Sequence, residues 1–180
     1  MYTLRLTRQL LAAVAADPAE QAAEAPTTAL GDWYVAPVLA KRRRLLLCTS
    51  ELSLLSVLLP AEQLDQLPEH LAVALVGVLH RLQLPRAAVA REIDAMTSGD
   101  IGPARHRSTL GAMRGLASRA RAFLANSSSE VDVAALYTHL GEYRSRAAGP
   151  QTAAARAVAL LLARSPDRPA GASPRRRARS

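Results

Sequence analysis

The chain of 180 residues is predicted to be an α+β protein, a small antiparallel sheet packed against several helices. Short apolar segments rich in strand-forming residues occupy the first third of the chain. From residue 67 onward, apolar residues recur at the three- and four-residue spacing of helices. The final residues, 165–180, contain little that a core could bury. We therefore expect one domain over residues 1–164, followed by a disordered basic tail over 165–180.

The first element is predicted to be a strand. Residues 3–7 alternate polar and apolar side chains, and residues 8–16 then have helical composition and end before Asp17-Pro18. This stretch also resembles a secretory signal, because two Arg precede a short apolar run. The run lies at the lower length limit for such a signal, so we interpret the segment as a strand that leads into a helix.

The second and third strands are predicted to form a β-hairpin centred on residues 33–49. Both faces of the extended segment 33–40 are apolar, so both faces are expected to be covered. Pro37 has no N–H to donate, which places this strand at a sheet edge or at a bulge. Residues 44–49 form the partner strand, and the cations between the two strands, Lys41 to Arg43, then form the turn.

Helices are predicted for most of the remaining chain. Residues 54–59 are either a further strand or a helical turn, and 101–105 are a possible short strand. The expected helices begin at Pro68, which suits the first turn of a helix, and continue at 85–96, 108–125, 131–144 and 152–163.

The helix over 108–125 has the clearest pattern. Its apolar residues fall within an arc of about 140°, and Arg114, Ser118 and Arg121 share the adjoining polar side. Ser108 is the predicted N-cap. Gly111 and Gly115 lie mostly opposite the apolar arc, where another backbone or a ligand could approach closely.

The positive charge is unevenly distributed. The net charge is +8, and residues 165–180 carry five Arg against one Asp, which is half of this excess. Lys41 is the only Lys, so the abundance of Arg and Ala reflects a GC-rich genome as much as a selected surface. The tail is either a solubilising extension or a nucleic-acid contact, with its cations at Arg175, Arg176, Arg177 and Arg179.

Several classes of site and location are not supported. No apolar run approaches the ~20 residues that span a bilayer. Cys48 is the only Cys, which excludes an internal disulfide and fits a cytoplasmic protein. It follows three Leu, so a buried side chain is favoured over a nucleophile. The four His lack the spacing of a metal site, and no nucleotide-binding or nucleophile-elbow motif is present. We expect no metal and no cofactor.

Two stretches combine polar and special residues. Asp32, Trp33 and Tyr34 either line a pocket or form the entry to a strand, with Trp33 in the core. Arg107, Ser108 and Gly111 stand at a helix start, where free N–H groups attract anions. They form either a phosphate or carboxylate site or a capped helix with a solvated Arg. We expect the two stretches to meet across a shared pocket or core seam.

These stretches resemble an uncharacterised bacterial family of domains of unknown function. The resemblance covers roughly residues 1–140, and it rests on five segments: Thr7-Arg8-Gln9-Leu10, Leu30-Gly31-Asp32-Trp33-Tyr34, Arg42 or Arg43, Leu54-Leu55-Ser56, and Arg107-Ser108-Thr109-Leu110-Gly111-Ala112-Met113.

The chain departs from the family pattern at three positions. Ala36 or Pro37 follows the aromatics, and His106 and Arg114 flank the second motif, where the family has Asn. If those amides form a polar site in the family, that site is altered here. The resemblance implies no activity; it implies only that the Asp-Trp and Arg-Ser-x-Leu-Gly motifs belong to one structural or binding feature.

Two functions remain open, and the sequence does not decide whether the chain is an enzyme. The first is a non-enzymatic binding module for a protein or nucleic-acid partner, since no catalytic set is recognisable. The second is a hydrolase or transferase acting on a phosphorylated small molecule or nucleic acid. There, Asp32 would be the acid/base, Arg107 the anion clamp and Ser108 a helper. The oligomeric state is left open.

Overall fold

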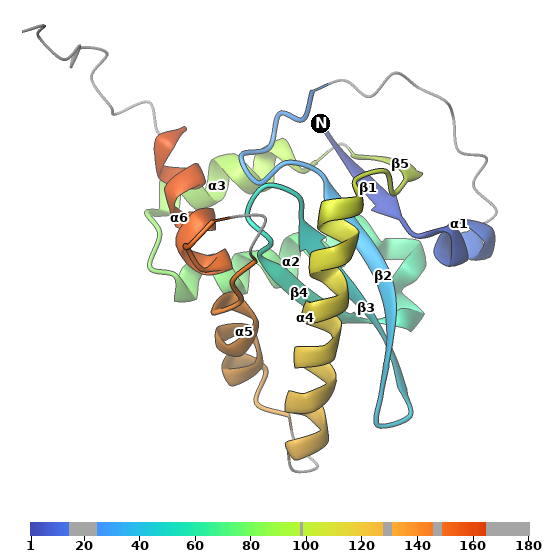
Figure 1. The fold of residues 1–180 in the computed structure, drawn as a ribbon. Coiled ribbons are helices and arrows are strands. Elements are labelled where there is room, and N and C mark those ends of the chain that lie inside the picture. Colours follow the sequence, from blue (N-terminus) through green and yellow to red (C-terminus); the bar gives the residue numbers. More distant parts are fainter. Residues whose placement is uncertain (15–24, 98, 128–130, 146–148, 165–180) are drawn as a thin grey trace, which may run out of the picture.

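A five-stranded mixed sheet forms the centre of the molecule. The computed structural model describes residues 1–14, 25–97, 99–127, 131–145 and 149–164. The strand order is β4-β3-β2-β1-β5, as Figure 1 shows. The strands are β1 (Tyr2–Leu6), β2 (Trp33–Ala40), β3 (Arg43–Ser50), β4 (Ser56–Pro60) and β5 (Gly99–Pro103). The α+β prediction is confirmed, and the predicted tail over 165–180 lies outside the described residues.

The N-terminal strand gives the sheet its mixed character. β2, β3 and β4 are antiparallel neighbours, as the predicted hairpin requires. β1 instead runs parallel to both β2 and β5. Parallel neighbours need a long crossover, which residues 7–32 provide between β1 and β2. The sheet therefore differs from the purely antiparallel one that the sequence suggested.

The predicted helices are present within a few residues of their expected bounds. Residues 54–59, left open between strand and helical turn, contain the start of β4, and the possible strand at 101–105 is β5. No helix within the described residues has the length and apolar character needed to cross a bilayer. The helical elements are α1 (Arg8–Val14), the 3-10 helix η1 (Ala61–Gln66), α2 (Leu67–Arg81), α3 (Arg86–Ala95), α4 (Arg107–Asn126), α5 (Val133–Gly141) and α6 (Ala153–Ala163).

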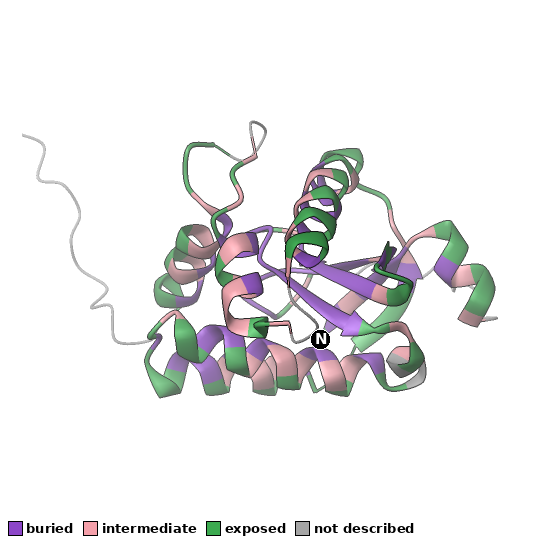
Figure 2. Cartoon of the chain, turned by 90° about the horizontal axis from the view of Figure 1, so that it is seen from below, coloured by how far each residue is buried: buried purple, intermediate pink, exposed green. Residues whose placement is uncertain are grey.

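Two apolar cores lie on opposite faces of the sheet, because β2 alternates its side chains between them. Trp33 and Val35 belong to the core shared with α1, α2, α3 and α6. Tyr34 and Val38 belong to the core shared with α4 and α5. Figure 2 shows the buried strands between helices whose outer sides are exposed. The prediction that both faces of β2 are covered is confirmed for these residues, whereas Pro37 and Leu39 are exposed.

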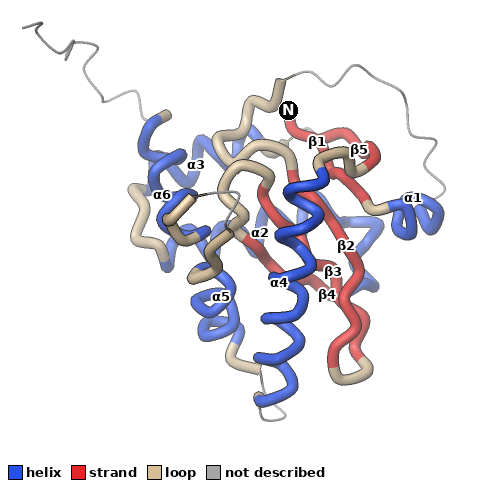
Figure 3. Tube along the Cα trace, viewed as in Figure 1, coloured by secondary structure: helices blue, strands red, loops and turns tan. Residues whose placement is uncertain are grey.

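The β2–β3 hairpin turns in two residues. Lys41 and Arg42 have φ of 45° and 64°, and two successive positive φ angles are typical of a type I′ turn, whose twist matches the flanking strands. Figure 3 shows this short loop at the tip of the two longest strands. The predicted turn is confirmed with Lys41 and Arg42 in it, whereas Arg43, which was also expected in the turn, is the first residue of β3.

Pro37 explains where β2 loses a neighbour. β2 is an inner strand, whereas the sequence predicted either an edge strand or a bulge, but β1 pairs with it only over Trp33 to Val35. From Pro37 onward, β2 pairs only with β3. Pro37 therefore lies where one side of β2 is a free edge and no N–H is needed for a ladder.

Candidate functional site

A buried ion pair joins the start of β2 to β1. Asp32 Oδ2 accepts a hydrogen bond from Arg5 Nε at 2.8 Å and pairs with Arg5 Nη2 at 2.8 Å. Its Oδ1 accepts the backbone N–H of Thr3 at 2.9 Å. Both ionic side chains are buried. Gly102 of β5 leaves room for the guanidinium, because a Cβ there would lie 3.2 Å from Arg5 Nη1.

The ion pair changes what Asp32 can do. Its carboxylate oxygens bond to Arg5 and Thr3, and no hydrogen bond or ion pair within the described ranges joins Asp32 to Arg107. Both oxygens of the Asp32 carboxylate are thus occupied by donors of the chain itself. The Asp32 carboxylate therefore holds β1 to the start of β2. The acid/base role, which belongs to the second of the two functions that the sequence left open, stays a hypothesis.

A second polar group lies beside the start of α4. Tyr34 Oη accepts the backbone N–H of His106 at 3.2 Å, and the two rings stack with centroids 6.3 Å apart. His106 Nδ1 pairs with the Glu51 carboxylate. The His106 side chain is 63% exposed, and burial raises the pKa of Tyr34. The two motifs singled out in the sequence therefore meet through Tyr34 and His106.

The remaining predicted residues separate into core and surface. Trp33 is fully buried on the other face of the sheet, against α2, because neighbouring residues in a strand point to opposite faces. It is a core residue rather than a binding residue. Arg107, Ser108 and Gly111 are exposed. α4 begins at Arg107 with His106 at the N-cap, so Ser108 is not the cap that was predicted.

The two helix glycines also have different roles. A Cβ at Gly111 would meet nothing within 4 Å, so its side of α4 is open space. A Cβ at Gly115 would lie 2.8 Å from Tyr143 Oη. The close approach expected at these glycines is therefore made by a side chain of the chain itself, and only at Gly115.

An exposed basic stripe runs along α4. Five exposed positions on one side of the helix are named together as the outer face of α4: Arg107, Gly111, Arg114, Ser118 and Arg121. Arg107, Arg114 and Arg121 are spaced by seven residues, about 10.5 Å per step, on one side of the helix. α4 contains no acidic residue. The outer face therefore presents three cations separated by small side chains.

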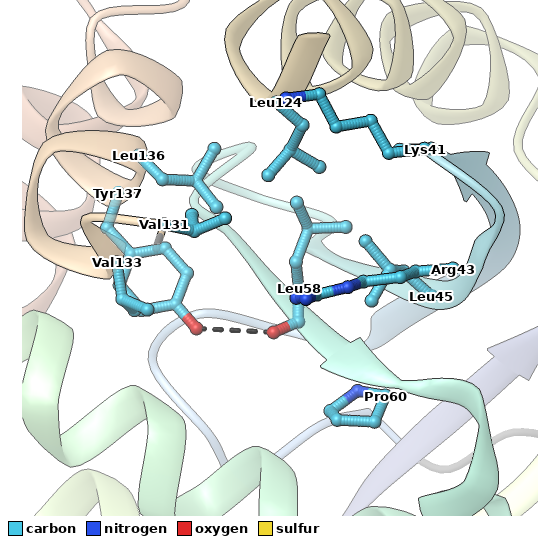
Figure 4. Close-up of a pocket in the computed structure, with 11 residues that line it drawn as sticks. Lys41, Arg43, Leu45, Leu58, Pro60, Leu124, Val131, Val133, Leu136 and Tyr137 are labelled. Atoms are coloured by element: carbon cyan, nitrogen blue, oxygen red, sulfur yellow. Dashed lines mark hydrogen bonds between the residues drawn. The ribbon is translucent and has the colours of Figure 1, made fainter. Parts of the chain in front are cut away.

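A cavity of about 420 Å³ opens at the other end of α4, between the hairpin and α5. We call it the hairpin cavity; Figure 4 shows its lining side chains. Most of them are apolar, and two, Lys41 and Arg43, are cationic. The lining residues are Ala40, Lys41, Arg43, Leu45, Leu58, Pro60, Leu124, Val131, Val133, Leu136 and Tyr137.

Several polar residues that matter were not singled out from the sequence. Arg5 stands between Leu4 and Leu6 of a buried strand, and a charge at such a position is a signal of a buried partner. Glu92 falls between Ala88 and Met96 on the apolar side of α3. No comparable local signal marks Glu51 or the hairpin cavity, because both depend on segments far apart in the chain.

Cys48 is part of the core, as predicted. It lies in β3, and its side chain is fully buried. Burial raises the pKa of its thiol far above the ordinary value. A thiol in that state is not a nucleophile near neutral pH. Across the described residues, no group of three or more His, Cys, Asp or Glu side chains could hold a metal ion.

Comparison with known proteins assigns the chain to a family but does not assign an activity to it. No curated protein and no solved structure matches the chain. The family described as "Domain of unknown function (DUF6933)" matches residues 3–148. This range contains all of the sheet except Tyr2, the Asp32 and Arg107 motifs, the outer face of α4 and the hairpin cavity. The chain therefore belongs to the family of unknown function DUF6933.

Proposed function

We propose that the protein is a non-enzymatic binding module that holds the phosphate backbone of duplex nucleic acid on the outer face of α4. The observation that carries the proposal is the row Arg107, Arg114 and Arg121, exposed on one side of a helix without acidic residues. Arg binds phosphate oxygens with two parallel N–H groups, so a row of this kind favours a polyanion over an apolar protein surface.

The surface between the cations supports the same proposal. Gly111 and Ser118 separate the Arg side chains, and a Cβ at Gly111 would meet no atom of the described residues within 4 Å. A phosphate backbone could therefore approach the helix closely. No aromatic residue lies on the outer face to stack on bases, so single-stranded binding is not favoured. Contacts to phosphates alone imply binding that is largely independent of base sequence.

The test is a titration of a labelled 20-base-pair DNA duplex at increasing NaCl concentrations. We expect the R107Q/R114Q/R121Q variant to bind more than tenfold more weakly at low salt. Each lost phosphate contact should also reduce the slope of log affinity against log salt by about 0.9. The matched control is R8Q/R81Q/R86Q, which removes the same charge from exposed positions elsewhere, and it should bind like wild type.

The C-terminal tail needs a separate arm of this experiment. Residues 165–180 carry five Arg, and deletion of this segment tests its own contribution. A gel shift that disappears with the tail and is unchanged in the R107Q/R114Q/R121Q variant would overturn the proposal and assign the binding to the tail. Equal loss in both triple variants, or no binding of DNA at all, would also overturn it.

A second candidate is a phosphoester hydrolase or transferase, favoured by the His106–Glu51 pair beside Arg107. A histidine oriented by a carboxylate is a common general base, and Arg107 follows it directly. This candidate predicts turnover of p-nitrophenyl phosphate or bis-p-nitrophenyl phosphate that is lost in H106A and kept in R86Q. The absence of turnover in the purified wild-type chain would contradict it.

The location is part of the proposal. We propose a bacterial cytoplasmic protein, supported by the resemblance to a bacterial family and by the single, buried Cys48, which suits a reducing compartment. Fractionation of cells that express the tagged chain tests this location. Recovery of the chain outside the cytoplasmic fraction would contradict it.

A further inference from the structure

The hairpin cavity has the dimensions of a small-molecule site. Its volume of about 420 Å³ lies within the ~300–1,000 Å³ range of ligand pockets. Three elements distant in sequence form it: the β2–β3 hairpin with β4, the C-terminal part of α4, and the start of α5. Because the cavity lies beside the end of α4 opposite His106 and Arg107, a ligand there would be separate from the Tyr34–His106 group.

The cavity walls are suited to an apolar ligand body. Leu45, Leu58, Leu124 and Leu136 face it together with two Val side chains and one Pro, as Figure 4 shows. The Tyr137 hydroxyl donates its hydrogen bond to the Leu58 carbonyl at 3.3 Å, so its proton is not available to a ligand. Burial raises the pKa of Tyr137, so this hydroxyl stays neutral. The interior therefore offers mainly apolar contact to a ligand.

The charged side chains that line the cavity, among the residues that the structure describes, have a single sign. They are Lys41 and Arg43. Lys41 Nζ donates to the Ser127 carbonyl at 2.6 Å, which fixes the ammonium near the end of α4 and leaves its other protons available. Asp132 is not among the lining residues, and its carboxylate caps α5 through the Ala135 N–H. In the described part of the wall, a bound ligand would therefore meet positive charge without a competing acid.

From this combination, we propose that the hairpin cavity binds an amphipathic carboxylate, an aliphatic acid whose chain lies among the Leu side chains and whose head group pairs with Arg43 and Lys41. Apolar walls supply most of the affinity, at about fourfold per methylene buried. The two cations select an anionic head over a neutral or positive one. This proposal does not depend on nucleic-acid binding by the outer face of α4.

The test is calorimetric titration of the full chain with hexanoate, octanoate and decanoate below their micelle concentrations. We expect saturable 1:1 binding that tightens by about fourfold per methylene. Decanol, which has the same chain and no charge, should bind at least tenfold more weakly, and decyltrimethylammonium should not bind. R107Q/R114Q/R121Q should bind decanoate like wild type, which separates this site from the proposed nucleic-acid face.

Two matched variants connect the binding to this cavity. R43Q should weaken decanoate binding about tenfold, whereas R44Q, the exposed neighbour that does not line the cavity, should not change it. V133W should abolish binding by filling the cavity. Val133 is 50% exposed, so the fold should tolerate this change, and an unchanged melting temperature verifies that.

Each of the following results would overturn the proposal: equal binding of decanol and decanoate, equal effects of R43Q and R44Q, or several decanoate molecules bound per chain. Binding that persists in folded V133W would also overturn it. A Leu-rich peptide with a free C-terminus that binds more tightly than decanoate would replace the small carboxylate with a protein partner.

Discussion

The two faces of the sheet each bury one acidic side chain, and the groups that stabilise the two carboxylates differ. On the face that packs against α2 and α3, Glu92 is buried and accepts the backbone N–H groups of Ala29 and Leu30 at 2.7 and 3.0 Å. On the face that packs against α4, Asp32 is buried with Arg5 as its counter-ion. One acid is thus held mainly by amide dipoles and the other by a full positive charge.

The two faces also differ in what they carry: one is mainly apolar core, and the other carries the candidate sites. The α2 face contains Trp33, Cys48 and the largest apolar core. The α4 side carries the Arg5–Asp32 pair, the Tyr34–His106–Glu51 group, the exposed Arg row and the hairpin cavity. Glu92 has a raised pKa because burial outweighs its two amide bonds. The lesson is that a motif residue such as Asp32 can be polar, buried and structural at once.

The largest effect is expected where the ion pair is broken. D32A leaves the Arg5 guanidinium buried without its counter-ion, which should lower the free energy of unfolding by about 3–5 kcal/mol. Urea denaturation measures this loss. The control is D100A on β5, an exposed position, where a change within about 0.5 kcal/mol is expected. A similar small effect of D32A would mean that Asp32 is not the structural acid of this face.

A smaller, pH-dependent effect is expected for the other acid. E92Q leaves one of the N–H groups of Ala29 and Leu30 without an acceptor, at a cost of about 1–3 kcal/mol. Burial raises the pKa of Glu92, so the folded state binds this proton more tightly than the unfolded state. The stabilisation of the folded state that comes from protonated Glu92 is complete below the ordinary pKa of Glu. It is lost as the pH rises through the raised pKa of Glu92 in the folded state.

The measurement for Glu92 is urea denaturation of wild type and E92Q from about pH 4 to about pH 8. The stability difference between them should be largest at the acidic end and decrease toward neutral pH. The control E62Q changes an exposed acid in η1. A difference that grows with pH would show that the amide bonds, rather than burial, dominate the titration of Glu92.

The smallest effect compares the two glycines of α4. G111A should stabilise the chain by about 0.5–1 kcal/mol, because Ala favours the helix and its Cβ would meet only open space. G115A should not give this gain, since the new Cβ would lie 2.8 Å from Tyr143 Oη. Thermal unfolding of both variants measures the difference. Equal stabilisation would indicate that Tyr143 moves away without cost.

The sequence predicted what depends on local pattern. The period of residues 33–49 and the cations between the two apolar runs predicted the hairpin, because strand alternation and turn chemistry are both set by near neighbours. The apolar arc of residues 108–125 likewise predicted the face that α4 buries, including Met113 and Leu116. Ser108 was wrong as the cap, because helix ends shift by a residue without altering that arc.

The sequence predicted that its two polar motifs meet, but tertiary structure alone decided through which residues distant segments make contact. Arg5 and Asp32 are 27 positions apart, and they pair only because β1 runs parallel to β2 after a crossover. His106 reaches Tyr34 across 72 positions, and the hairpin cavity forms where three distant segments leave an unfilled volume. Such contacts depend on strand order and helix packing, whereas periodicity specifies only the face to which each side chain points.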